Sequence, residues 1–403
     1  MNVEDAFLIM SMVILIGFAG RLIREKTKIP EALFLIVFGL ILGPISGIVP
    51  GKEMLELVPF VSTAAMVSIL IESGIEFKIS KLTGALGTAT VFTLLVAVIT
   101  TVIVTCFLVI FFSWPIAHAA LLGLISSGTT TLTAMTLLNS VKVTNKIKNI
   151  ILRETIINDF TLIIGTFIIV GFIKVNNFGI SDAANLFFSE LTIGLLIGII
   201  FAIVWRQIML RLNKKKELTY ASTLGTCFMM YYVVSFLGGN AIISIFAFSL
   251  ILGNYDRISN FINSQMKRRK EEDFSQYLSR INSVKTDFGF FISSSFFVLL
   301  GIIFDPAIMN LELFMIAGGV LLIIIAARGA SATMISADDK DLAKHKLLIS
   351  LMIPRGYVAA VLAFVPLQQG IDIPGIANIM ILLIISTTLV AIAGTAAYAK
   401  MNG

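Results

Sequence analysis

Charged residues are scarce in this chain. They account for 13% of its 403 residues, against about 25% in a typical globular protein, whereas hydrophobic residues account for 57%. The mean hydropathy is correspondingly high, at +0.98. A chain of this composition could not cover a globular surface with polar groups, so we exclude a water-soluble protein and expect a membrane protein.

Cysteine and histidine are also rare, with two of each. Cys106 and Cys227 lie inside apolar runs without the spacing of metal ligands, so neither a disulfide framework nor a zinc site is predicted. His118 and His345 lie near the ends of apolar runs, where we expect surface or interface residues. Two such histidines supply neither a set of metal ligands nor a Ser-His pair, which disfavours an intramembrane enzyme.

Long apolar runs dominate the sequence instead. A helix of about 20 apolar residues crosses a hydrocarbon core about 30 Å thick. Thirteen runs emerge between charge clusters and loop signals, near residues 6–23, 31–49, 57–76, 83–112, 115–139, 150–174, 187–211, 218–236, 240–253, 285–304, 311–335, 343–366 and 373–398. We therefore predict an all-α polytopic membrane protein with about 13 transmembrane helices.

Lysine and arginine are distributed unevenly between the two sides of these runs. Twenty-five of the 30 lie on one side, Lys52 and Lys174 lie on the other, and Arg153, Arg328 and Arg355 lie in or at the edges of runs. Because positive residues accumulate in cytoplasmic loops, we predict a multi-pass protein of the cell membrane, with the N-terminus outside and the C-terminus cytoplasmic. Topology thus explains the net charge of +6, and no nucleic-acid partner is predicted.

The longest polar segment covers residues 255–286. We expect it to form a cytoplasmic loop with one or two short amphipathic helices. Its basic cluster, Lys267-Arg268-Arg269-Lys270, is explained by topology, although attraction to anionic membrane lipid is an alternative.

Few ionisable residues lie inside the predicted spans: Glu72, Glu154, Asp159, Arg328 and Arg355. A charge at the centre of the membrane costs about 2.5–3.5 kcal/mol even on insertion scales, so such residues indicate function. In 150–174, helical spacing places Glu154, Thr155 and Asn158 on one face and Asp159 on its edge. Such a face suits a partly dehydrated alkali cation or a proton, although buried polar pairs that join helices are an alternative.

Two predicted spans contain residues that interrupt helices. Ser126 to Thr131, with Gly128 among them, falls midway through the fifth span, and Pro354-Arg355-Gly356 falls midway through the twelfth. If the first six and last six spans form an inverted repeat with the seventh as linker, these two positions correspond. Two broken, crossing helices at equivalent positions are typical of the binding site of a secondary transporter.

Three motifs, in order along nearly the whole chain, carry a family resemblance. They are Lys28-Ile29-Pro30-Glu31 leading to Gly39-Leu40-Ile41-Leu42-Gly43-Pro44, then Glu154-Thr155-Ile156-Ile157-Asn158-Asp159, then Arg355-Gly356. Together they resemble the monovalent cation:proton antiporter superfamily, and the second resembles the signature of its electroneutral sodium/proton exchangers, the branch with an Asn-Asp motif.

The resemblance implies roles for individual residues. Asp159 would alternately bind cation and proton beside Asn158, with Glu72, Thr129 and Thr155 as further oxygen ligands of the monovalent cation. Glu154 and Arg328 would form a structural ion pair, and Gly128, Pro354, Arg355 and Gly356 would lie in the broken-helix region. Where the family typically has Thr-Asp-Pro, the chain has Thr129-Thr130-Thr131, so Thr130 replaces an acid expected near the ion.

The resemblance also implies an organisation and an activity. Residues 1–82 and 175–304 would form a scaffold and dimerisation domain, and 83–174 and 305–403 would form a core transport bundle. The implied activity is exchange of Na⁺, K⁺ or Li⁺ for H⁺ by alternating access, electroneutral and serving pH homeostasis, in a homodimer without a cofactor. Na⁺ is the expected ion. A K⁺/H⁺ antiporter, a cation channel and an intramembrane enzyme are the alternatives, although no channel filter sequence is found.

Overall fold

The computed structural model describes residues 3–27, 29–55, 57–76, 86–175, 180–211, 219–266, 275–337 and 339–402. All regular elements in this part of the chain are helices, which confirms the all-α fold class. The principal helices are α1 (Val3–Thr27), α2 (Glu31–Leu40), α3 (Gly51–Leu55), α4 (Val58–Glu76), α5 (Leu86–Phe112), α6 (Ile116–Ile125), α7 (Thr131–Leu138), α8 (Asn145–Val175), α9 (Ile180–Arg211), α10 (Thr219–Phe236), α11 (Ala241–Met266), α12 (Ser275–Ile302), α13 (Leu311–Ile335), α14 (Lys340–Lys344), α15 (Lys346–Leu351), α16 (Tyr357–Leu362), α17 (Val365–Gln368) and α18 (Ile376–Asn402).

Each of the thirteen apolar runs overlaps at least one of these helices. Among the described residues, six helices are long and apolar enough to cross a membrane by length and composition: α4, α5, α8, α9, α13 and α18. Shorter apolar helical stretches lie at Glu31–Ile45, Ile116–Ile125, Ala241–Tyr255, Gly289–Ile302 and Tyr357–Gln368, some of them because a predicted span is divided between two helices. The chain is a multi-pass membrane protein, while the number of thirteen spans and the inverted repeat remain predictions.

The polar segment 255–286 differs from its prediction. Instead of separate short helices, α11 continues to Met266 and α12 begins at Ser275, and the basic cluster from Lys267 lies outside the described residues. The physical reason is local, because neither glycine nor proline occurs between Gly253 and Gly289 to end a helix.

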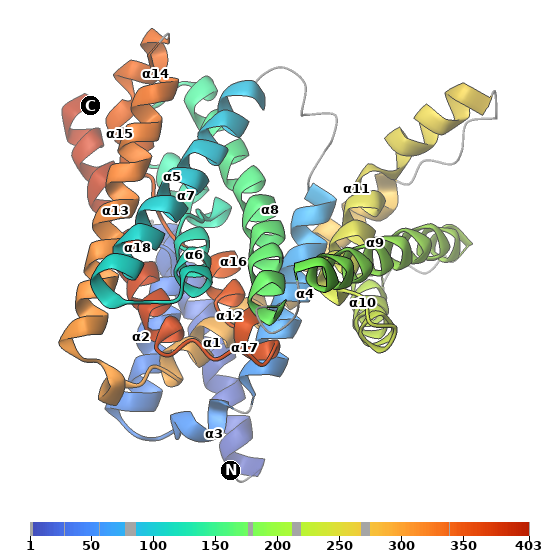
Figure 1. The fold of residues 1–403 in the computed structure, drawn as a ribbon, viewed down its shortest axis with the longest axis horizontal. Coiled ribbons are helices and arrows are strands. Elements are labelled where there is room, and N and C mark those ends of the chain that lie inside the picture. The colour runs from blue at the N-terminus through green and yellow to red at the C-terminus, as the bar shows by residue number, and fades with distance from the viewer. Residues whose placement is uncertain are drawn as a thin grey trace. The chain divides into compact units, whose positions relative to one another are not determined.

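The helices form two compact units. Unit 1 comprises Met1–Ser62, Ala85–Lys174 and Ser293–Gly403. Within it, α5 and α18 pack on α13, and α15 packs on both α13 and α18 (Figure 1). Buried apolar side chains of these helices and of α7 and α8 form one cluster that includes Phe92, Leu137, Ile150, Ile349 and Ala391. This cluster supports one side of the polar site.

The fifth predicted span divides into α6 and α7 because serine side chains in its middle form hydrogen bonds with nearby backbone carbonyl groups. The hydroxyl groups of Ser126 and Ser127 donate to the carbonyl oxygens of Gly123 and Leu124, at 3.0 and 2.7 Å. Side chains that bond local carbonyl groups compete with helix continuation. The helix ends at Ser126 and resumes at Thr131.

The twelfth predicted span divides between α15 and α16 at Pro354. Proline has no N–H group and disfavours a helical conformation in the residue before it. The freed groups find other partners: the Thr130 N–H donates to the Pro354 carbonyl oxygen at 3.1 Å, and the Arg355 N–H donates to Thr387 Oγ1 at 3.1 Å. The two interrupted spans therefore meet through their own backbones.

Glycine allows α2 and α12 to approach until their backbones touch. A Cβ atom added to Gly39 would lie 2.1 Å from the carbonyl oxygen of Val298, and one added to Gly301 would lie 2.2 Å from that of Ile36. The Gly39–Pro44 motif thus has a packing role within unit 1.

We expect Gly301→Ala to lower the thermal stability of the purified protein, because overpacking typically costs about 1–3 kcal/mol and the obstructing atoms here are backbone. Gly318→Ala in α13 is the matched control, since its added Cβ would meet no atom within 4 Å. Equal thermal unfolding of Gly301→Ala and the wild type in detergent would contradict the packing role.

Unit 2 comprises Thr63–Gly84 and Val175–Ile292, and in it α11 packs against α9 and α10. Arg206 of α9 is 2% exposed, with its guanidinium carbon 3.9 Å from the ring centroid of Tyr255. An arginine can stack its planar group on an aromatic face inside a bundle, so Arg206 packs within unit 2.

The two units overlap only in part with the predicted domains. Residues 1–62 belong to the same unit as the proposed transport bundle, and unit 2 contains most of 175–304. The assignment of 1–82 and 175–304 to a scaffold and of 83–174 and 305–403 to a mobile bundle remains a prediction.

Candidate functional site

The polar face of α8 lies inside unit 1. Glu154, Thr155 and Asn158 are 0% exposed and Asp159 is 9% exposed. All four residues lie within two turns of one helix. A charged or polar group at such a depth needs partners, and the residues around this face supply them.

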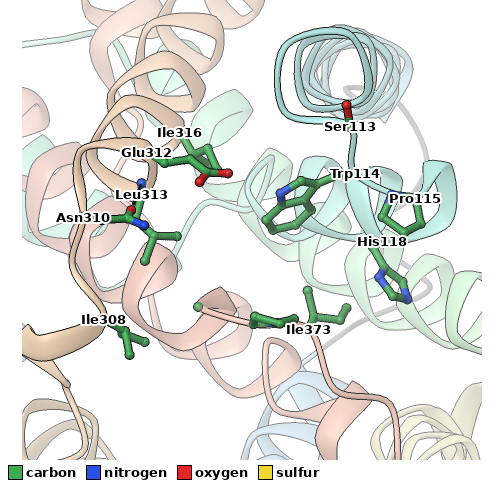
Figure 2. Close-up of a pocket in the computed structure, with 12 residues that line it drawn as sticks. Ser113, Trp114, Pro115, His118, Ile308, Asn310, Glu312, Leu313, Ile316 and Ile373 are labelled. Carbon is green, nitrogen blue, oxygen red and sulfur yellow. Dashed lines mark hydrogen bonds between the residues drawn. The ribbon is translucent and has the colours of Figure 1, made fainter.

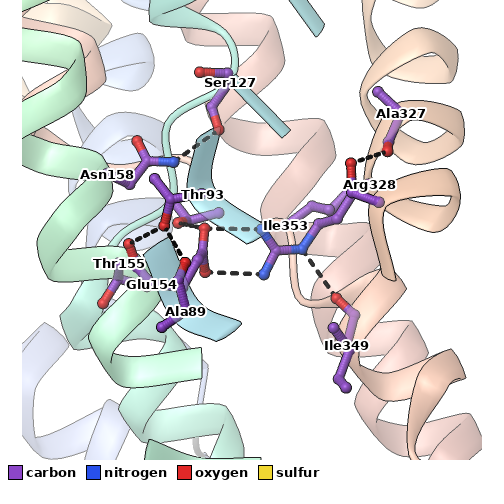
Figure 3. Close-up of polar contacts among 12 residues, drawn as sticks. Ala89, Thr93, Ser127, Glu154, Thr155, Asn158, Ala327, Arg328, Ile349 and Ile353 are labelled. Atoms are coloured by element: carbon purple, nitrogen blue, oxygen red, sulfur yellow. Dashed lines mark hydrogen bonds and ion pairs between the residues drawn. The ribbon is translucent and has the colours of Figure 1, made fainter. Parts of the chain in front are cut away.

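Glu154 forms a bidentate ion pair with Arg328 of α13. The two terminal nitrogens of the guanidinium donate to the two carboxylate oxygens, each at 3.0 Å, and Nε donates to the Ile349 carbonyl oxygen at 2.9 Å (Figure 3). The ring of Phe92 lies beside the guanidinium, 4.8 Å from its central carbon. All three nitrogens of Arg328 are therefore engaged, and the charge of Glu154 is neutralised.

Thr129 joins the same ion pair from the break between α6 and α7. Its hydroxyl donates to Glu154 Oε1 at 2.9 Å, and the side chain is 3% exposed. The hydroxyl proton is thus directed to Glu154, while the oxygen retains lone pairs that can accept a cation.

Thr155 links α8 to the start of α7. Its hydroxyl donates to the Leu152 carbonyl oxygen at 2.9 Å and shares a hydrogen bond of 2.8 Å with the hydroxyl of Thr131. A hydroxyl group has one proton, so Thr131 donates in the shared bond when Thr155 donates to Leu152. Thr155 and Asp159 lie one helical turn apart, on neighbouring positions of the surface of α8.

Asn158 contributes an oxygen that suits a cation. Its Nδ2 donates to the Ser127 carbonyl oxygen at 3.4 Å (Figure 3), whereas its buried Oδ1 accepts no hydrogen bond from any described residue. A buried amide oxygen without a donor is unusual in a folded protein. Hard cations prefer carboxylate, amide and hydroxyl oxygens, which are the groups present on this face.

The broken-helix residues surround the crossing. Thr130 packs so closely on Gly356 that a Cβ atom added to the glycine would lie 2.3 Å from that of Thr130. Arg355 is 1% exposed and its Nη1 donates to the Ile353 carbonyl oxygen at 3.3 Å; its Nε and Nη2 have no hydrogen-bond acceptor among the described residues. The buried positive charge lies beside carbonyl groups that the helix break exposes, where a cation is favoured.

Glu72 lies in unit 2, on α4. It is half-buried beside α12, where a Cβ atom added to Gly289 would lie 2.6 Å from Glu72 Oε1. Asp159 belongs to unit 1, so an approach of Glu72 to the cation remains a prediction.

A cavity of about 370 Å³ lies at one end of unit 1. It is lined by the ends of three segments, including Trp114, His118, Asn310, Glu312 and Ile373 (Figure 2). It shares no lining residue with the polar face of α8. His118 is thus a half-buried residue of this cavity.

His345 differs from its prediction as a surface or interface residue. It is 5% exposed, and its Nδ1 is hydrogen-bonded to the hydroxyl of Tyr398 in α18. Its Nε2 lies 3.6 Å from Asp341 Oδ1. The short helices α14 and α15 fold the segment back onto α18, which buries a residue that the sequence places in a loop.

Several residues of the site were not predicted individually. Thr131 and Ser127 belong to the hydroxyl-rich run in the fifth span, which was a usable signal. Phe92 and Thr387 lie in apolar runs without any distinguishing pattern. Their contribution depends on which helix faces the site, and a single sequence does not encode that locally.

Comparisons with known proteins identify a family. A sequence profile of the family described as sodium/hydrogen exchanger, transmembrane, matches residues 9–400. The chain is 24% identical over 380 residues to Na(+)/H(+) antiporter 1 of Methanocaldococcus jannaschii, which covers 90% of this chain and 83% of that protein.

Solved structures show a similar fold. The sodium proton antiporter MjNhaP1 from M. jannaschii at pH 8 has a TM-score of 0.74 and 21% identity, covering 100% of this chain and 98% of that chain. An electron-microscopy structure of MjNhaP1 has a TM-score of 0.73 and 22% identity, covering 99% and 96%. The family profile spans nearly the whole chain, including both broken spans and the polar face of α8. The chain therefore belongs to the transmembrane sodium/hydrogen exchanger family, whose members are membrane antiporters rather than enzymes.

Proposed function

We propose that the protein exchanges Na⁺ for H⁺ electroneutrally, with Asp159 as the group that binds either ion. The observation that carries this proposal is the bidentate pairing of Glu154 with Arg328. Of the two carboxylates on α8, Glu154 is neutralised by Arg328, whose three guanidinium nitrogens are all engaged. We therefore assign the exchange to Asp159. One carboxylate binds one proton or one monovalent cation, which makes the exchange one for one.

The ligands of the cation would come from the face around Asp159. Asn158 Oδ1 and the hydroxyl oxygens of Thr155 and Thr129 are candidates within unit 1, and Glu72 would approach from unit 2. Thr130 replaces an acid that the family typically has, which removes one negative charge from this region. This supports a single exchangeable charge rather than two.

Alternating access would come from movement of 83–174 and 305–403 against the remaining helices. Two divided spans that meet at Thr130 and Pro354 support this, because a short break between half-helices allows an ion to be reached from either side. We also propose a homodimer in the cell membrane, with the N-terminus outside and the C-terminus cytoplasmic.

Na⁺ is the proposed ion because the matching relatives are named sodium proton antiporters. K⁺ is the competing ion, and only transport distinguishes the two. The test is proton movement in proteoliposomes under an imposed pH gradient, with Na⁺, K⁺ or Li⁺ added in parallel. We expect Na⁺ to dissipate the pH gradient even when the membrane potential is not clamped, because electroneutral exchange moves no net charge. Dissipation of the gradient by K⁺ but not by Na⁺ would identify K⁺ as the transported ion. Transport driven by voltage at zero ion gradients would contradict the electroneutral mechanism.

A further inference from the structure

A second, smaller cavity of about 40 Å³ reaches the crossing of the broken spans. It is lined by Thr130 and Gly356 from the two helix breaks, and by Arg24, Pro30 and Glu31 from the region where α1 ends and α2 begins. One water molecule needs roughly 10–15 Å³ of such volume, so the cavity can hold a few waters or a partly hydrated monovalent cation. All its lining residues belong to unit 1.

Two of the residues that line this cavity form an ion pair. Arg24 Nη1 of α1 lies 3.0 Å from Glu31 Oε2 of α2, and the two side chains are 24% and 19% exposed. Pro30 directly precedes Glu31 at the N-terminus of α2, and both residues line the cavity. Arg21 is a second positive neighbour of Glu31. A carboxylate that lines the cavity is thus paired with one arginine and lies near a second.

A chain of polar contacts leads inward from the cavity. Thr130 lines its inner wall, and the next residue, Thr131, is hydrogen-bonded to Thr155 at 2.8 Å. Thr155 lies one turn from Asp159 on α8. A lining residue of the cavity is therefore next in the chain to a residue that is hydrogen-bonded to the polar face of α8.

We propose that Glu31 is the first contact for the cation at the end of unit 1 that carries Arg21 and Arg24, here called the basic face, and that Arg24 competes with the cation for it. This inference rests on the proposed exchange function and adds a residue that sets the affinity at one face. The plain alternative is that the Arg24–Glu31 pair only holds α1 against α2. The two hypotheses differ in the expected effect of Arg24→Gln on the apparent KM for Na⁺. The substitution lowers KM if Arg24 competes with the cation, and it does not lower KM if the pair is only structural.

The test compares Glu31→Gln with Arg24→Gln in vesicles of known orientation, with Na⁺ supplied at the basic face. Local charge can change association by about tenfold or more at low ionic strength, so we expect Glu31→Gln to raise the apparent KM for Na⁺ by about that factor. Arg24→Gln should lower KM, because it unmasks the carboxylate. Both shifts should shrink in high salt of an impermeant ion, since screening weakens charges near a surface.

Two controls belong to the same experiment. Glu312→Gln changes the same chemistry at the other cavity and should leave KM at the basic face unchanged. Na⁺ supplied at the opposite face should give wild-type KM in every variant. If Glu31→Gln does not fold, Glu31→Asp keeps the charge and should stay within about twofold of wild type, while Arg24→Gln still tests the sign.

The outcomes separate this inference from the proposed function. Wild-type vesicles without cation-for-proton exchange would refute the proposed function. If the wild type is active and both variants shift KM in the same direction, or neither variant shifts it, the proposed role of Glu31 is overturned. The proposed exchange function would then still stand.

Discussion

Asp159→Asn is expected to reduce cation-driven proton movement to the level of protein-free liposomes, in a protein that still folds. Asparagine has nearly the shape of aspartate but neither binds an exchangeable proton nor carries the charge that attracts Na⁺. Glu154 cannot substitute for Asp159, because both of its oxygens are held by Arg328 at 3.0 Å. The measurement is the initial rate of gradient dissipation in proteoliposomes that contain equal amounts of folded protein.

The wild type should show competition between the two ions. If one carboxylate binds either a proton or Na⁺, the apparent Na⁺ affinity falls by up to about tenfold for each pH unit below the pH at which the carboxyl group titrates. Asp372→Asn is the matched control, since this aspartate is exposed in the loop between α17 and α18. Coupled proton movement that survives in Asp159→Asn would move the exchange site to another residue.

Glu154→Gln and Arg328→Gln are expected to destabilise the protein strongly. Both side chains are 0% exposed, and removing one leaves a buried charge without its partner. Such a change typically costs about 3–5 kcal/mol. Arg328 also donates to the Ile349 carbonyl oxygen and packs on Phe92, so Arg328→Gln releases contacts among α5, α8, α13 and α15. Folded yield and thermal unfolding in detergent measure the loss.

The double substitution is the sharper measurement. Glu154→Gln combined with Arg328→Gln removes both charges, so its destabilisation should be smaller than the sum of the two single changes. Asp159→Asn, five residues further along α8, should keep near wild-type stability and serves as the control. Single variants that fold normally but bind Na⁺ differently would assign the pair to transport instead of structure.

The site was predictable where residue type alone carries the signal. Charges inside apolar runs drew attention to Glu154, Asp159, Arg328 and Arg355, because burial of charge is costly wherever it occurs. Glu154 and Arg328 are 174 residues apart in the chain, and their pairing was expected only from the family resemblance. The bidentate geometry, the Thr129 hydroxyl and the Phe92 ring depend on how four helices face one another.

The sequence by itself determined where helices form, where two of them break and that the protein lies in a membrane. These properties follow from local causes: apolar run length, the missing N–H of Pro354, and the hydroxyl groups of Ser126 and Ser127 that bond nearby carbonyls. The tertiary structure alone decided the burial of His345 and Arg206, the contact of Gly39 with Gly301 and the pairing of Arg24 with Glu31 beside the small cavity. Those features arise from contacts between helices, and hydropathy and propensity along a single chain do not specify which helix faces meet.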